Sequence, residues 1–166
     1  MKRQCAWCKK EMGESPLADE MGEHEITHGI CEDCANNILF QQGASLSLFL
    51  NSLTEPVLLL DESGAVQMPN RAAVKHLGLA EDAFANKQPG QIFECQHARF
   101  PPGCGKTIHC SGCTIRMAIK KTMETGRGVV RLPATLHQDS ADVRLLISTE
   151  KVGAVVLLRI EELVPK

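Results

Sequence analysis

The sequence predicts an α+β fold, in which an antiparallel sheet carries helices on one face and a small cysteine-rich appendage precedes it. Three observations support this prediction. Apolar runs at 56–60 and 65–68 flank a turn at 61–64 and form a hairpin. Three segments near the C-terminus alternate apolar and polar residues, as half-buried strands do. All eight cysteines fall into two groups of four.

Helices are expected between the hairpin and the last three strands. Asn70 suits an N-cap and Gly78 a C-terminal stop, so one helix is predicted between them. Short helical turns are expected at 81–84 and 90–93. A longer helix is predicted from about Ser111 to Thr125, because its apolar residues recur at helical spacing and a glycine follows it.

The C-terminal strands are predicted at 130–136, 143–147 and 154–160. Pro133 indicates an edge position for the first of them, since proline cannot donate to the ladder. Their polar positions are expected to face solvent, and these include Arg131, Arg144 and Arg159.

Three parts follow along the chain. Residues 1–35 form a four-cysteine, zinc-knuckle-like segment, and 36–53 form a helical linker. A first helix is expected to begin near Glu32 and to reach Phe40. The main domain covers 54–162 and contains a cysteine-rich insertion at 94–113.

Composition narrows the class of protein. A formal charge of −2 gives no basic surface for nucleic acid, and 4% aromatic residues without tyrosine leave few stacking platforms. No apolar run is long enough for a membrane span, and the N-terminus lacks a signal-peptide core. The sequence therefore predicts a cytoplasmic protein that binds neither nucleic acid nor membrane.

The first cysteine group consists of two C-x2-C pairs separated by 22 residues: Cys5, Cys8, Cys31 and Cys34. Two such pairs can give four thiolates to one tetrahedral zinc ion, so a structural zinc site is predicted. A disulfide framework would require export, and a thioredoxin-like pair would require a βαβ unit. His28 could replace a cysteine, but a lone histidine more often lies beside the ligands or on the surface.

The second cysteine group, in the insertion at 94–113, has the spacing C-x8-C-x5-C-x2-C and consists of Cys95, Cys104, Cys110 and Cys113. Neighbouring glycines allow tight turns around a small centre. Zinc, an iron–sulfur cluster and metal-free redox thiols all suit four cysteines, so all three alternatives stay open. His97 and His109 could replace a cysteine, but a position on the surface or beside the ligands is favoured for them.

The order of strands and helices over about 44–162 resembles the PAS domain. The resemblance rests on four short motifs: Glu55–Asp61, Gly64–Val66, Asn70–Ala73 and Thr122–Gly126. The first cysteine group resembles a knuckle that precedes some bacterial sensory domains. The second resembles an insertion in a subset of bacterial PAS domains, with a C-x-H-A start, a G-C-G core and a closing C-x-x-C.

The resemblance implies sensing or protein interaction and does not identify a signal. Together with the cysteine groups, it leads to the hypothesis of signal transduction by a stand-alone sensor of redox state or metal, with output through contacts with a protein partner or a second copy in a dimer. The alternative is an interaction module, an adaptor or dimerisation domain, in which both sites are structural zinc. No nucleophile elbow, nucleotide motif or paired carboxylates occur, so an enzyme is not expected.

Overall fold

The structure, a computed structural model, describes residues 2–14, 26–35 and 43–164. It divides into two compact units, Met1–Phe49 and Leu50–Lys166. Each unit contains a sheet of its own. No helix in the described ranges is long and apolar enough to cross a membrane.

The first unit contains a three-stranded sheet that the sequence patterns did not reveal. β1 (Lys2–Cys5) lies in the middle, antiparallel to β2 (Glu11–Glu14) and parallel to β3 (Ile26–Gly29). A helical segment begins at Glu32 as predicted, and 32–35 is its described part. The predicted continuation to Phe40 lies outside the described residues.

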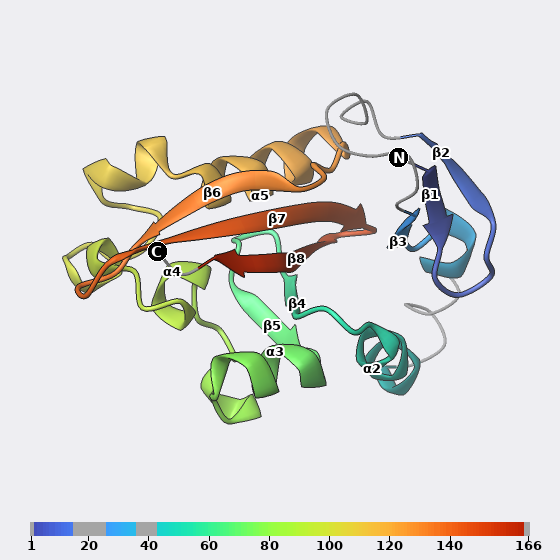
Figure 1. Cartoon of the computed structure of the whole chain (residues 1–166), viewed down its shortest axis with the longest axis horizontal. Helices are drawn as coiled ribbons and strands as arrows, with labels where there is room; N and C mark the ends of the chain where they lie inside the picture. The colour runs from blue at the N-terminus through green and yellow to red at the C-terminus, as the bar shows by residue number, and fades with distance from the viewer. Residues whose placement is uncertain (1, 15–25, 36–42, 165–166) are drawn as a thin grey trace. The chain divides into compact units, whose positions relative to one another are not determined.

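Five antiparallel strands form the sheet of the second unit, in the order β5-β4-β8-β7-β6 (Figure 1). Their bounds are β4 (Val57–Leu60), β5 (Val66–Pro69), β6 (Leu132–His137), β7 (Asp142–Val152) and β8 (Val155–Val164). The predicted hairpin and all three predicted C-terminal strands are present. Pro133 lies on β6, which is an edge strand as expected.

In chain order, the helices come before β4 and between β5 and β6. They are α2 (Gly43–Ser52), α3 (Arg71–Leu77), η1 (Glu81–Ala83), α4 (Pro89–Ile92), η2 (Gln96–Arg99), η3 (Ile108–Gly112) and α5 (Thr114–Thr125). α5 packs on β6, β7 and β8, whereas α3 contacts β4 and β5. The core between sheet and helices is formed by buried apolar side chains, among them Leu58, Leu60, Phe84, Ile115, Ile119, Leu145, Ile147 and Leu158.

Two sequence predictions need correction. The long helix begins at Thr114 and not at Ser111, because 108–112 form the separate 3-10 turn η3 and Cys113 is extended between the two. Arg159 is 9% exposed and does not face solvent, because β8 is the central strand and lies between β4 and β7. Arg144, nearer the edge of the sheet, is exposed as predicted.

Asn70 joins three parts of the second unit through one fully buried side chain. Its Oδ1 accepts hydrogen bonds from the backbone N–H of Ala73, at 2.8 Å, and of Val57, at 3.0 Å. Its Nδ2 donates to the carbonyls of Leu50, at 3.0 Å, and Glu55, at 2.9 Å. The predicted N-cap therefore also fixes the end of α2 and the start of β4.

Replacing Asn70 is expected to destabilise the protein strongly. Asn70→Ala leaves buried N–H and C=O groups unsatisfied and should lower the free energy of unfolding by about 3 kcal/mol. Asn70→Asp should also destabilise, because a carboxylate oxygen would face backbone carbonyls. Urea unfolding of the full chain, followed by circular dichroism, measures both. A loss no larger than that of the exposed control Gln67→Ala would contradict this account.

Candidate functional site

The four cysteines of the first group, the first quartet, converge on one point. Their ligand atoms all lie within 4.8 Å of one another, and no other group of three or more potential metal ligands in the described ranges meets that criterion. β1 and β3 run parallel with Cys5 beside Gly29, so both C-x2-C pairs are delivered to the same end of the small sheet.

Burial and hydrogen bonds change the pKa values of two cysteines in the first quartet. Burial disfavours the thiolate of Cys5, but N–H groups of Cys31, Cys8 and Trp7 outweigh it and lower its pKa to about 6. Burial raises the pKa of Cys34, and hydrogen bonds with the neighbouring thiols add to that effect. A bound cation would therefore displace the Cys34 proton and be attracted by the Cys5 thiolate.

The donor set fits one soft metal ion. Cys5, Cys31 and Cys34 are buried and Cys8 is exposed, so the site lies at the surface of the knuckle. Four sulfurs at this spacing match a closed tetrahedral structural site, for which thiolate is the preferred ligand. The side chain of His28, which was weighed as a ligand, lies outside the described part of the structure.

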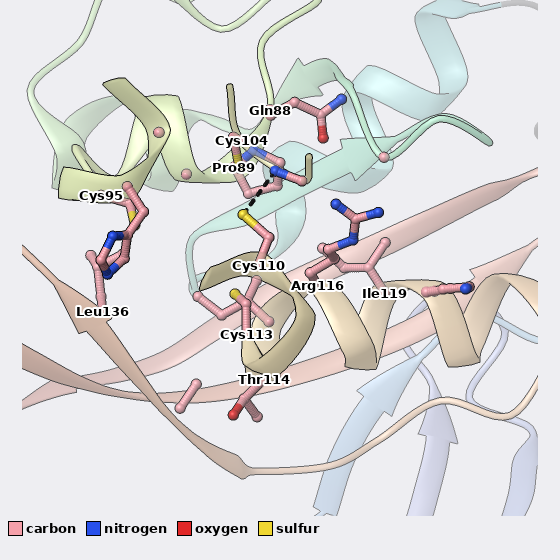
Figure 2. A pocket seen from close by; sticks show the side chains of 18 of the residues that line it. Gln88, Pro89, Cys95, Cys104, Cys110, Cys113, Thr114, Arg116, Ile119 and Leu136 are labelled. Carbon is pink, nitrogen blue, oxygen red and sulfur yellow. Dashed lines mark hydrogen bonds between the residues drawn. The ribbon is translucent and has the colours of Figure 1, made fainter. Parts of the chain in front are cut away.

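The four cysteines of the second group, the second quartet, line one cavity of the second unit, of about 1110 Å³. Figure 2 shows them around the pocket. Cys95 caps η2, Cys104 lies in the turn after it, Cys110 lies in η3, and Cys113 is the N-cap of α5. The structure thus gathers this quartet around a common space, with wider spacing than the first quartet.

In the second quartet, two neighbouring groups contact the sulfur of Cys110. The N–H of Gly105 donates to its Sγ at 3.1 Å, and the Thr107 hydroxyl lies 3.2 Å away. Burial acts to raise the pKa of Cys110, but these contacts and the charge of Arg116 lower it. For Cys104, burial raises the pKa. The Cys110 thiol therefore loses its proton more easily than the Cys104 thiol when no metal is bound.

Three histidines line the same cavity. The rings of His97 and His109 stack with centroids 4.1 Å apart, and His137 meets His97 edge-on at 5.7 Å. Asp142 holds His137 Nδ1 at 2.8 Å. Nδ1 of His97 is buried without a hydrogen-bond partner in the described structure, and burial lowers the pKa of that ring.

Sequence reasoning found the cysteines but missed the groups that support them. His137 lies on β6, 40 residues from His97, so no local pattern could join them. Gly90, Thr107 and Arg116 were also missed. Arg116 follows Cys113 by three residues in a predicted helix, and this spacing was the one signal available.

Comparison with solved structures identifies the fold. A domain of the sensory box sensor histidine kinase/response regulator from Geobacter sulfurreducens matches with a TM-score of 0.50 and 14% identity, covering 75% of this chain and 96% of that one. The second unit has a PAS-like fold.

Other PAS-like structures match somewhat less closely. The PAS domain of nitrogen regulation protein NR(II) from Vibrio parahaemolyticus has a TM-score of 0.49 and 16% identity, covering 70% of this chain and 96% of that one. The photoactive yellow protein domain of the sensor histidine kinase Ppr from Rhodospirillum centenum has a TM-score of 0.48 and 13% identity, covering 77% and 99%. At such identities the likeness concerns the fold alone.

Sequence comparison adds no family. No protein-family model matches the chain, and no curated protein sequence matches it. The predicted PAS fold is confirmed, whereas the resemblance of the cysteine-rich segment to a known insertion stays a prediction.

Gly90 offers a direct test of how tightly the second quartet is packed. A Cβ at this position would lie 2.5 Å from Cys104 Sγ, so Gly90→Ala must displace that thiol. We expect a loss of about 1–3 kcal/mol in the free energy of unfolding, typical of overpacking. Gly112→Ala is the matched control, because nothing lies within 4 Å of its added Cβ. Equal urea midpoints for the two variants would contradict the packing described here.

Proposed function

We propose that this chain is a sensory signalling protein whose second quartet, Cys95, Cys104, Cys110 and Cys113, holds a redox-active metal centre, while the first quartet holds a structural zinc. The observation that carries the proposal is the position of the second quartet. Its cysteines line one cavity, and the last of them is the N-cap of α5. A chemical change at Cys113 would act directly on the N-terminal end of α5, which packs on the sheet.

The two quartets support different metals. The first has the spacing of a single tetrahedral ion. The second surrounds a large cavity and has an N–H group directed at one sulfur, which favours a multinuclear iron–sulfur cluster. When bound, such a cluster exchanges one electron with an external one-electron carrier.

Contacts at two places connect the cysteine-rich insertion and its neighbouring residues to the sheet, and these contacts would transmit a change in the insertion. Through α5, the Thr122 hydroxyl lies 2.6 Å from that of Thr149 on β7. Through the β6–β7 turn, Gln138 Nε2 donates to the Phe93 carbonyl at 2.9 Å, and an ion pair joins Arg99 to Asp139. A rearrangement between 93 and 113 would therefore shift the edge of the sheet, where a protein partner or a second copy would detect it.

Metal analysis of protein purified without oxygen tests this function. We expect the full chain to contain zinc and iron. Cys110→Ser/Cys113→Ser should lose the iron and keep about one zinc, whereas Cys31→Ser/Cys34→Ser should lose that zinc and keep the iron.

The opposite result is equally informative. If anaerobic reconstitution with iron and sulfide leaves no iron and no charge-transfer absorbance, an iron–sulfur centre in the second quartet is contradicted. Two zinc ions per chain would then favour the alternative, a metal-stapled interaction module.

A further inference from the structure

We propose that Arg116 is the counter-cation of the second quartet, and that its positive charge determines how tightly the quartet holds a negatively charged metal–thiolate centre. The inference rests on the proposed function, because it requires the quartet to bind metal. It concerns a residue that lies outside both cysteine groups.

The Arg116 side chain is in contact with the loop that holds Cys110. A Cβ on Gly105 would lie 2.6 Å from Nη1 and 3.4 Å from Cζ of Arg116, so the guanidinium lies directly against the Gly105 backbone. The N–H of that same glycine donates to Cys110 Sγ at 3.1 Å. Figure 2 shows Arg116 beside the cysteines at the pocket. Guanidinium, glycine and thiol therefore form one continuous set of contacts.

Arg116 lines the cavity and, among the residues that the structure describes, makes no ion pair with any aspartate or glutamate. Lys120, one turn later on the same helix, pairs with Glu124 at 3.8 Å. Arg116 is exposed to solvent at this cavity wall, and its charge would attract an anionic occupant.

The position of Arg116 in the first turn of α5 also favours an anionic partner. It is the third residue of the helix, whose first turn contains no acidic side chain. Cations are disfavoured there, because the helix N-terminus already carries partial positive charge. Four thiolates around one divalent ion leave a net negative charge, which would compensate for both the helix end and the arginine. The charge of Arg116 also contributes to the lowered pKa of Cys110.

Cadmium affinity tests the proposal. The parent protein for this test is the full chain with Cys5→Ser and Cys8→Ser, two substitutions that remove the first quartet as a competing site. Cd²⁺ affinity is then measured by chelator competition, using thiolate-to-cadmium charge-transfer absorbance. We expect Arg116→Gln to weaken binding about fivefold and Arg116→Lys, which keeps the charge, to stay within about twofold. Lys120→Gln is the matched control, with the same charge change one turn away, and should also stay within about twofold.

Salt dependence separates charge from structure. Raising the ionic strength to 1 M should weaken Cd²⁺ binding to the arginine-containing protein and reduce the difference from Arg116→Gln, because screening removes only a charge effect. A difference that persists unchanged in high salt would assign Arg116 a packing role and overturn the proposal.

The remaining outcomes are distinct. Binding that is equal in Arg116→Gln and the parent overturns the inference and leaves the proposed metal site intact. Equal weakening in Lys120→Gln overturns it too, since the effect would then be one of net charge. No Cd²⁺ binding by the parent also overturns the inference, whereas the proposed function is tested separately by the iron content of the full chain.

Discussion

The packing of α5 against the sheet is the constraint on which the second unit depends. Ile115, Ala118 and Ile119 are buried on one side of this helix, and Thr122 is fully buried beside Thr149. This buried hydroxyl pair restricts sliding of the helix, because any other register would take the Thr149 partner away from the buried Thr122 hydroxyl. The helix start, and Cys113 with it, is therefore fixed relative to β7.

The two quartets use the same ligand in different settings. The first is assembled by short parallel pairing of β1 and β3 in a unit whose described part buries few large side chains, so bound metal would supply much of its stability. The second lies in a domain that already has its own core. We therefore expect that domain to fold without metal, so that under the proposed function the presence or oxidation state of a bound metal would act as the signal.

Much of the fold could be predicted from the sequence because its signals are local. Alternation located the three C-terminal strands, and apolar runs on either side of a turn located the hairpin. Asn70 and Gly78 marked the ends of α3, and Pro133 marked the edge of the sheet. The start of α5 was misplaced, since the 3-10 turn η3 has helical composition but ends at the extended Cys113. The sheet of the first unit was missed because its four-residue strands are too short to show a period.

The candidate site could be predicted only in part, because sequence signals are local. Cysteine spacing found both quartets, but the His97–His137 contact and the Gly90–Cys104 contact join distant residues.

The most direct test of the central claim is hydrogen exchange of the α5 amides in the full chain, reconstituted with iron and sulfide and compared in its oxidised and dithionite-reduced forms. The account predicts altered protection over 114–122 and unchanged protection in β4. Identical exchange in the two forms, with the metal bound in both, would contradict it.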